Sequence, residues 1–273
     1  RKTMLQDIAP YKFHCEYEPR EVNLKQDYLL AYKGDKVLLK DGHIPFVSEL
    51  QEMLALEDLQ FLFTVDEIAF YSPKEALIET NGLEYKSIQK FRTYLPRHLA
   101  FAGITGYHLA TWYAGNKFCG VCGSKNFHKA DERALVCPKC GRIIYPNISM
   151  AVVVAIIDGE EILLTKYPGR TTYALIAGFV EIGETFEDTC IREVMEEVGL
   201  KIKNLRFYGS QPWGFSQSMM VGYFAELDGS KEITLDTNEL GEAAWVKRSE
   251  MPESDAGISL TYTMMEEFRK GRI

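Results

Sequence analysis

The clearest pattern of hydrophobic and polar positions lies in the second half of the chain. Residues 150–157 read MAVVVAII, an apolar run typical of a strand buried on both faces, and residues 161–167 read EILLTKY. The short DGE segment between them predicts a hairpin. Residues 206–213 and 219–227 also predict strands, and residues 260–271 predict a closing helix. The pattern therefore indicates a domain that mixes strands and helices.

Residues 186–198 predict a helix whose two ends carry local signals. Thr185 and Asp188 have the spacing of a capping box, and Gly199 is a natural C-terminal stop. The helical period predicts an apolar stripe on one face and a row of glutamates on the other. The apolar positions are Ile191, Val194, Met195 and Val198. The acidic positions are Glu193, Glu196 and Glu197.

The N-terminal part of the chain shows a weaker pattern. Residues 27–42 predict a hairpin with Gly34 and Asp35 near its turn. Residues 94–116 predict a helix with Pro96 in its first turn, although two glycines weaken its middle.

Composition and charge narrow the class of protein. The chain has 273 residues, which suggests one large domain or two smaller ones. Its longest apolar run is too short to cross a bilayer, and its N-terminus lacks the apolar stretch of a signal peptide, so we expect a cytoplasmic protein without membrane contact. The net charge of -8 argues against a general nucleic-acid binder, but it leaves room for an enzyme that binds one small phosphate-bearing ligand.

Four of the six cysteines form the pattern C-x2-C-x14-C-x2-C at Cys119, Cys122, Cys137 and Cys140. Each pair lies in a glycine-bearing turn, and two such turns can complete a tetrahedron of thiolates around zinc. Disulfides or a redox pair are the alternatives, but both are less typical of a cytoplasmic chain with two paired turns. Because four thiolates leave no position for water, the predicted zinc is structural.

The acidic helix face suggests a second metal. Glu193, Glu196 and Glu197 place like charges at neighbouring positions, which costs stability unless a cation offsets them. Carboxylate oxygens suit Mg2+ or Mn2+, ions that hold phosphates and activate water. Gly178 and Gly183 would let the preceding loop approach a phosphate closely. The alternative is an acidic helix face that is simply solvated.

Residues 178–200, GFVEIGETFEDTCIREVMEEVGL, fill every defined position of the Nudix box, G-x5-E-x7-R-E-U-x-E-E-x-G-U, in which U is a bulky aliphatic residue. The chain thus resembles the Nudix hydrolase family, which cleaves nucleoside diphosphates linked to another group with the help of Mg2+ or Mn2+. The resemblance implies that Glu193, Glu196 and Glu197 ligate the metal and that Arg192 and Glu184 brace the loop against the helix. One carboxylate should act as general base; we favour Glu197, although the sequence does not separate the three.

Residues 210–218, SQPWGFSQS, resemble the SQPWPFPxS array of the NADH pyrophosphatase branch of this family, with two prolines replaced. The resemblance implies substrate contacts along this segment, and a planar nicotinamide or adenine ring needs aromatic faces such as Trp213 and Phe179. From the residues alone, Trp213 is also readable as a core tryptophan beside a turn. The predicted binding residues are Phe179, Gln211, Pro212, Trp213, Gly214, Phe215, Ser216, Gln217 and Ser218.

The same branch carries a zinc ribbon directly before its Nudix domain. Alignment on the cysteines places its substrate-contacting glutamate and tyrosine at Glu132 and Tyr145. Asn147 replaces the arginine of the branch's short signature, so one expected cation is missing. Glu132 is equally readable as a surface acid between the two cysteine turns.

The resemblance also implies two ligands from outside the helix. Ala177 matches a main-chain carbonyl ligand, and carbonyl oxygen is chemically suitable for Mg2+. Glu239 matches a further carboxylate ligand before a strand, with Glu242 as its local competitor.

The implied fold class is α/β. We expect a Nudix α/β/α sandwich with a mixed sheet in residues 147–273 and a zinc ribbon in residues 114–146. A smaller α+β domain should occupy residues 1–113, where residues 27–42 faintly echo residues 152–167, as in a decayed duplication. No second Nudix box is present, so no chemistry is expected there.

The function that follows is hydrolysis of the pyrophosphate bond of NADH or NAD+ to nicotinamide mononucleotide and AMP. ADP-ribose, another dinucleotide or the NAD cap at the 5' end of RNA are alternative substrates within the family. A regulator that senses a nucleotide without cutting it is the alternative from another class, although no metal-ligating carboxylate of the box is lost. The branch also implies a homodimer.

Overall fold

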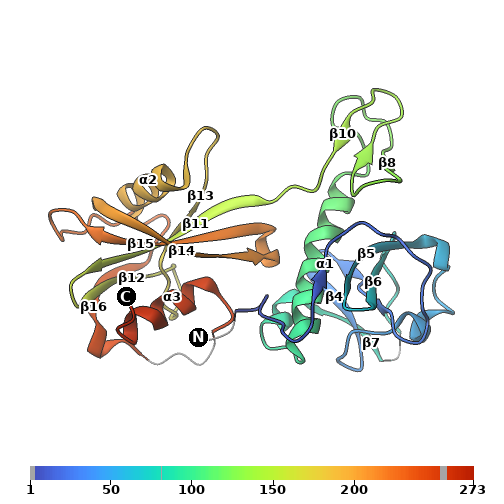
Figure 1. Cartoon of the computed structure of the whole chain (residues 1–273), viewed down its shortest axis with the longest axis horizontal. Coiled ribbons are helices and arrows are strands. Elements are labelled where there is room, and N and C mark those ends of the chain that lie inside the picture. The colour runs from blue at the N-terminus through green and yellow to red at the C-terminus, as the bar shows by residue number, and fades with distance from the viewer. Residues whose placement is uncertain (1–3, 81, 253–256) are drawn as a thin grey trace. The chain divides into compact units, whose positions relative to one another are not determined.

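The computed structural model describes residues 4–80, 82–252 and 257–273 of the chain (Figure 1). The chain forms two compact units. The first unit contains the described residues of 1–6, 148–213 and 218–273, and the second contains those of 7–147 and 214–217. The division into residues 1–113, 114–146 and 147–273 stays a prediction.

The first unit is built on one six-stranded sheet. Its strands in spatial order are β14 (Ile202–Trp213), β15 (Ser218–Leu227), β11 (Ser149–Asp158), β12 (Glu161–Lys166) and β16 (Glu242–Lys247), with β13 (Ile176–Phe179) paired to β11. β11 and β15 run parallel and the other neighbours run antiparallel, so the sheet is mixed. The predicted hairpin is present, with Asp158 paired to Glu161.

Two helices cover opposite faces of this sheet, α2 (Phe186–Val198) and α3 (Leu260–Arg269) (Figure 1). The central strand β11 explains how one apolar run serves both faces, because alternate side chains of a strand point to opposite sides. Towards α2 it presents Val152, Val154 and Ile156. Towards α3 it presents Val153, Ala155 and Ile157. The expected α/β/α sandwich is confirmed.

The helix α2 begins and ends where its local signals predict. Thr185 caps the N-terminus in a capping box with Asp188, and Gly199 ends the helix in the left-handed conformation. The predicted apolar stripe, however, is half wrong, because Ile191 and Met195 are exposed. The buried face has the spacing i, i+3, i+4, i+7 and i+8, which includes two of the glutamates. Its members are Cys190, Glu193, Val194, Glu197 and Val198.

The second unit contains two small sheets in its N-terminal part. The first sheet has the order β1 (Phe13–His14), β5 (Leu59–Val65), β6 (Ile68–Pro73) and β2 (Tyr28–Leu29). The second has the order β3 (Tyr32–Lys33), β4 (Lys36–Lys40) and β7 (Leu83–Ser87). β3 and β4 form the predicted hairpin, and Gly34 has a φ of 58° in its turn. Short 3-10 helices complete the connections: η1 (Val47–Leu50), η2 (Leu56–Asp58) and η3 (Ile88–Arg92) in this unit, and η5 (Arg248–Glu250) in the first.

The helix α1 (Arg97–Gly115) leads from these sheets to the cysteine-rich segment (Figure 1). Its two glycines, which weaken the helix in isolation, allow close packing. A Cβ atom at Gly103 would overlap the ring of Phe91, and one at Gly106 would overlap the side chain of Leu30. Tertiary packing therefore offsets the low helix propensity of both glycines.

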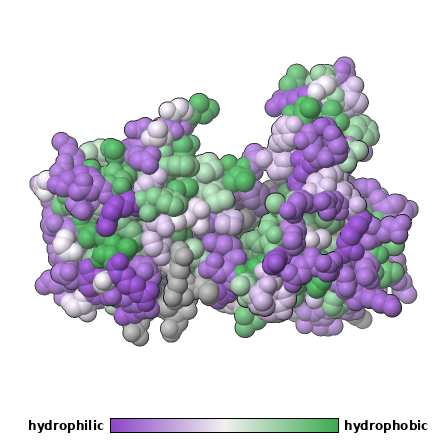
Figure 2. All heavy atoms as spheres, in the orientation of Figure 1, coloured by the Kyte–Doolittle hydropathy of each residue, from purple (hydrophilic) through white to green (hydrophobic). Residues whose placement is uncertain are grey.

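The cysteine-rich segment forms a small three-stranded sheet in the order β10 (Ile143–Ile144), β9 (Leu135–Val136) and β8 (Phe127–His128). Apolar side chains are exposed on this segment, and Figure 2 shows hydrophobic patches over it. They include Phe118, Val121 and Phe127. Within the described part of the chain, the helices are too short or too polar to cross a membrane.

Candidate active site and metal centres

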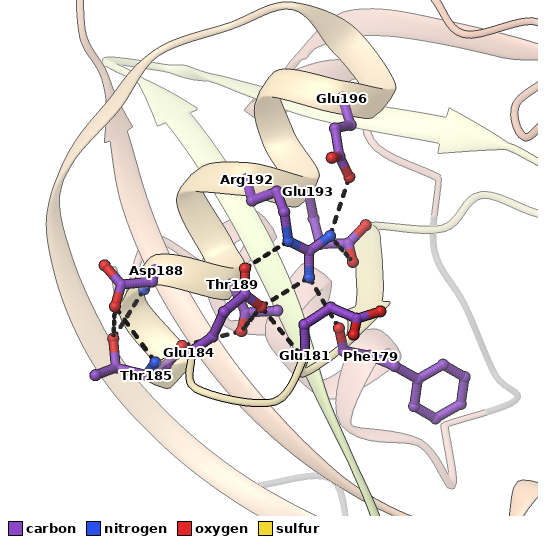
Figure 3. A network of polar contacts seen from close by, with 9 residues as sticks. All are labelled: Phe179, Glu181, Glu184, Thr185, Asp188, Thr189, Arg192, Glu193 and Glu196. Atoms are coloured by element: carbon purple, nitrogen blue, oxygen red, sulfur yellow. Dashed lines mark hydrogen bonds and ion pairs between the residues drawn. The ribbon is translucent and has the colours of Figure 1, made fainter.

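Arg192 is the centre of a polar network between α2 and the loop that precedes it (Figure 3). Its Nε and Nη2 atoms donate to the two carboxylate oxygens of Glu184 at 2.6 and 2.9 Å. Its Nη1 atom donates to Glu193 at 2.7 Å and to Glu196 at 3.0 Å. Nη2 also donates to the carbonyl oxygen of Phe179 at 3.0 Å. One planar guanidinium thus ties the end of β13, the loop and the helix together.

Glu184 completes this brace from the loop. The Arg192 guanidinium, together with the amide of Glu181 and the hydroxyl of Thr189, holds the pKa of Glu184 at about 2. The hydroxyl of Thr189 donates to Glu184 at 2.9 Å, and the amide of Glu181 donates to it at 3.1 Å. The carboxylate is therefore ionised and fixed in orientation at neutral pH.

Glu193 lies against the backbone of β13. A Cβ atom at Gly178 would overlap the Glu193 carboxyl group, so the side chain occupies the space that only glycine leaves open. Glu193 is 9% exposed, and burial raises the pKa of its carboxyl group, although Arg192 acts in the opposite direction. The first glycine of the box therefore sets the position of one predicted metal ligand.

Glu197 is the most deeply buried of the box glutamates, with 4% of its surface exposed. Burial raises the pKa of Glu197 to about 8, and the negative charges of Glu193 and Glu239 add to the effect. The backbone N–H of Ala177 donates a hydrogen bond to this carboxylate and partly offsets the shift. β13 thus contacts both buried glutamates, one through a glycine and one through an amide.

Glu239 is exposed, but its charge raises the pKa of both Glu193 and Glu197, which places it at the same site. Glu196 is largely exposed and pairs with Arg192. Two buried carboxyl groups that resist ionisation, with further carboxylates acting on them, fit a divalent cation, because the cation would offset both the cost of burying their charge and the repulsion between them. The charges of Glu193 and Glu239 therefore act on Glu197, and the amide of Ala177 contacts it. Within the described residues, however, only the four cysteines lie with all ligand atoms inside 4.8 Å of one another, so a shared metal site of these glutamates stays a prediction.

The structure places Gln211 in the core rather than at a surface. It is 0% exposed. Its Nε2 atom donates to Gln6 and to the carbonyl of Ile258, and its Oε1 atom accepts from the amide of Leu260 at 2.6 Å. These bonds join β14 to the start of α3 and to the N-terminal segment. The expectation that the Gln211 side chain binds substrate conflicts with this placement, because its amide is engaged in structural bonds.

The rest of the 210–218 segment runs from the last residues of β14 through a short turn to the first residue of β15. Pro212 and Ser216 are exposed, Trp213 and Gln217 are half-buried, and Ser218 is buried at the start of β15. Residues 214–217 belong to the second unit and contain the short helix η4 (Gly214–Ser216).

Within the second unit, η4 packs closely on α1. A Cβ atom at Gly214 would overlap the carbonyl oxygen of Ile104, and the ring of Phe215 lies 4.7 Å from the guanidinium carbon of Arg92. Gly214 therefore stands where a bulkier residue, such as the proline of the branch pattern, would not fit. In the first unit, the ring of Phe179 is 54% exposed and free to meet a ligand.

The four ribbon cysteines form the second centre. Their sulfur atoms all lie within 4.8 Å of one another, and none is in a disulfide. The amides of Val121 and Cys122 lower the pKa of Cys119, and hydrogen bonds from Ser124 lower the pKa of Cys122 to about 6. The amide of Arg142 acts to lower the pKa of Cys140, but the neighbouring thiols of Cys137 and Cys119 raise it to about 11. The preformed geometry fits the predicted structural zinc, and the cation would offset the mutual repulsion of the thiolates.

Glu132 and Tyr145, predicted from different parts of the ribbon, are brought together. The Tyr145 hydroxyl donates to Glu132 Oε1 at 3.2 Å, and Lys129 forms an ion pair with the same oxygen. Tyr145 is 54% exposed, so its ring is accessible. Their roles toward a substrate stay predictions.

Three residues at the glutamate site are not apparent from the sequence pattern. Thr189 looks like an ordinary helix residue, but it is buried and binds Glu184. Tyr167 and Asp236 come from distant segments, and the charges of the site glutamates raise the pKa of Tyr167 beyond the effect of its burial. Asp236 in turn adds to the raised pKa of Glu197. Only the tertiary fold reveals these neighbours.

Two family models match the parts of the chain that contain the box glutamates and the ribbon cysteines. Residues 148–266 match the model of the NUDIX domain, and residues 116–145 match that of the NADH pyrophosphatase zinc ribbon domain. An NAD-capped RNA hydrolase of Haemophilus influenzae is 38% identical over 233 residues, which cover 81% of this chain and 86% of the relative. A relative of the same name from Citrobacter koseri is 44% identical over 149 residues, covering 54% of this chain and 58% of the relative. A solved NUDIX hydrolase from Nitrosomonas europaea is 24% identical, with a TM-score of 0.49 and coverage of 57% of this chain and 92% of that one.

Proposed function

Because the chain belongs to the Nudix hydrolase family, we propose that it cleaves the pyrophosphate bond of NADH or NAD+ to give nicotinamide mononucleotide and AMP. The observation that carries this proposal is the pair of buried glutamates, Glu193 and Glu197, held against β13 with raised pKa values. Together with Glu196, Glu239 and the Ala177 carbonyl, they would hold Mg2+ or Mn2+. When bound, such an ion supplies positive charge to phosphoryl oxygens and makes a bound water more acidic.

The chain's own groups perform the remaining tasks. Glu197 is the candidate general base, because the amide of Ala177 orients its carboxylate and burial raises its proton affinity. Arg192 and Glu184 hold the loop and helix in register, so that a phosphate meets the ligands in a fixed geometry. This division separates residues that would touch the reacting groups from residues that only position them.

Aromatic side chains support a substrate with a planar ring. Phe179 lies at the end of β13, four residues before Gly183 and beside the Arg192 network, with its ring exposed. Trp213 ends β14, and Tyr145 pairs with Glu132 in the ribbon. An exposed ring can stack on nicotinamide or adenine.

The NAD cap of RNA is a second candidate substrate. It is favoured by the relatives, which carry the name NAD-capped RNA hydrolase. The same bond would be cut in both substrates. A cytoplasmic location and a homodimer belong to this proposal as well, and both follow from the resemblance to the family.

Product chromatography tests the proposal. The zinc-loaded chain is incubated with Mg2+ or Mn2+ and, in parallel, with NADH, NAD+, ADP-ribose and an NAD-capped RNA, and Glu197→Gln is the inactive control. We expect nicotinamide mononucleotide and AMP from NADH or NAD+, and nicotinamide mononucleotide with 5'-phosphorylated RNA from the capped RNA. Cleavage of ADP-ribose alone would overturn the choice of substrate, and binding without cleavage would favour a nucleotide sensor.

A further inference from the structure

The second unit contains a cavity of about 770 Å³ that the proposed hydrolysis does not use. All residues that line it belong to the second unit. Its walls come from α1, from the end of β6 with the residues that follow it, and from the ribbon around β8. The cavity is large enough for a mononucleotide, since pockets for small ligands typically have several hundred Å³.

Aromatic rings make up much of the wall. The rings of Tyr113 on α1 and His128 on β8 lie 5.1 Å apart between centroids. Those of Tyr32 and Tyr107 lie 5.5 Å apart at another part of the cavity. Burial and the charge of Lys74 lower the pKa of His128, which favours the neutral form of its ring. Such a surface suits the face of a planar ring.

Asn126 gives this wall a specific polar group. The residue is 7% exposed, and its Nδ2 atom donates to the carbonyl of Asn116 at 2.8 Å. Its Oδ1 atom is buried and has no hydrogen-bond partner in the residues that the structure describes. An acceptor without a donor is unfavourable. Because this oxygen has almost no accessible surface, a ligand with an N–H group would satisfy it only after a small movement of the Asn126 side chain toward the cavity.

Positive charge lies at the edge of the cavity. Lys125 is exposed, next to Asn126, and has no ion-pair partner within the described ranges. Lys117 pairs with Glu75 at 3.1 Å, and Lys74 pairs with Asp58 at 3.2 Å. The uncompensated lysine therefore favours an anionic group on the ligand.

We propose that this cavity binds a nucleoside monophosphate whose base carries an amino group. The base stacks on the wall that contains Tyr113 and His128, its amino group donates to Asn126 Oδ1, and its phosphate pairs with Lys125. The ligand is either a free nucleotide or one nucleotide of a single-stranded RNA, since both present the same chemistry. This binding site is independent of the glutamates on α2.

Calorimetry with AMP and adenosine tests the proposal on the full zinc-loaded chain in buffer without added Mg2+ or Mn2+. Ala114→Trp places an indole in the cavity from the exposed face of α1, and Lys125→Ala removes the unpaired charge. The control, Lys139→Ala, changes an exposed ribbon lysine outside the cavity. Zinc content and the midpoint of thermal unfolding show that each variant is folded.

We expect AMP to bind, Ala114→Trp to abolish binding, and Lys125→Ala to weaken AMP about tenfold while adenosine changes little. Lys139→Ala and Glu193→Gln should leave AMP binding unchanged. Tighter binding of an uncapped oligoadenylate than of AMP would identify RNA as the source, and the reverse order would identify the free nucleotide.

Three outcomes would overturn the site: no binding of AMP, binding of AMP that Ala114→Trp leaves intact, and binding of AMP that Glu193→Gln removes. The proposed cavity site and the proposed hydrolysis can be disproved independently of each other. The cavity proposal stands if AMP binds as expected while NADH is not cut, and the hydrolysis proposal stands if NADH is cut at an unchanged rate by Ala114→Trp.

Discussion

The cysteines of the ribbon and the glutamates around α2 are both clusters of anionic ligands, but the chain holds them in different ways. The four sulfur atoms already lie within 4.8 Å of one another, and backbone N–H groups lower the pKa values of Cys119 and Cys122. Burial instead raises the pKa values of Glu193 and Glu197. Despite a backbone N–H donor, the neighbouring thiols raise the pKa of Cys140 to about 11, so the ribbon does not favour all four thiolates. The difference lies in geometry and donors. The ribbon holds its sulfur atoms close together and gives backbone N–H donors to Cys119, Cys122 and Cys140, whereas α2 keeps two carboxylates buried, where a cation would offset the cost of their charge.

The largest effect on stability should come from removing one of the four thiolate ligands of the ribbon. Cys137 is fully buried in the ribbon, and structural zinc in small domains contributes about 10–16 kcal/mol of binding free energy. We expect Cys137→Ser to lose the zinc and to unfold the ribbon, as measured by metal analysis and by thermal unfolding. Cys15→Ser, which changes an exposed cysteine outside the ribbon, is the control. If the Cys137→Ser chain retained one zinc ion and an unchanged midpoint of thermal unfolding, the ribbon would not depend on all four thiolates.

The next largest effect should be on catalysis, from a change in the glutamates of α2. Glu197→Gln removes a charge that would face both the cation and the attacking water, and we expect turnover of NADH to fall about a thousandfold, roughly 4 kcal/mol of barrier. The matched control is Glu232→Gln, an exposed glutamate of the same unit. Initial rates with Mg2+ measure the difference. An equal loss of turnover in Glu197→Gln and Glu232→Gln would show that the effect is not specific to the site.

A smaller effect should follow from displacing Glu193 without removing it. In Gly178→Ala the new methyl group would overlap the Glu193 carboxyl group, so the side chain must move, and we expect turnover to fall about a hundredfold. Gly209→Ala is the control, because a Cβ atom at Gly209 meets no other atom within 4 Å. A normal rate in Gly178→Ala would mean that the contact between β13 and Glu193 does not position the ligand.

The smallest effect should be that of the raised pKa of Glu197 on the free energy of unfolding, measured without divalent cations. Below about pH 4.5 Glu197 carries its proton in both the folded and the unfolded chain, so it contributes nothing. Between that pH and about 8 only the folded chain retains the proton, so the stability contributed by this group falls as pH rises.

Thermal unfolding of the Mg2+-free chain measures this contribution. Glu197→Gln should raise the unfolding midpoint at pH 8 relative to the unchanged chain, by about 2–4 °C for each kcal/mol, with little change near pH 4.5. If the midpoints differed equally at both pH values, the raised pKa would not be the cause.

The sequence predicted local features better than tertiary ones. The ends of α2 follow from Thr185, Asp188 and Gly199, because caps depend only on neighbouring residues. The buried face of α2 was assigned wrongly because two glutamates occupy core-facing positions. Periodicity alone counts a carboxylate as polar and therefore as exposed.

The role of Gln211 shows the same limit. Its motif position predicts a ligand contact, but its partners come from residues 6, 258 and 260, which no local pattern connects to it. The four-residue strand β13 also escaped prediction, since it is short and contains Gly178. It nevertheless supplies the contacts that position Glu193 and Glu197.

Whether the α2 glutamates form a catalytic metal centre can be tested by titrating NADH turnover with Mg2+ for the unchanged chain and for Glu197→Gln, at constant zinc content. We expect nicotinamide mononucleotide and AMP to form only when Mg2+ is added, with a rate that saturates in the unchanged chain and stays near background in the variant. Equal turnover without Mg2+, or equal rates in the two chains, would contradict the assignment of the α2 glutamates as the catalytic metal centre.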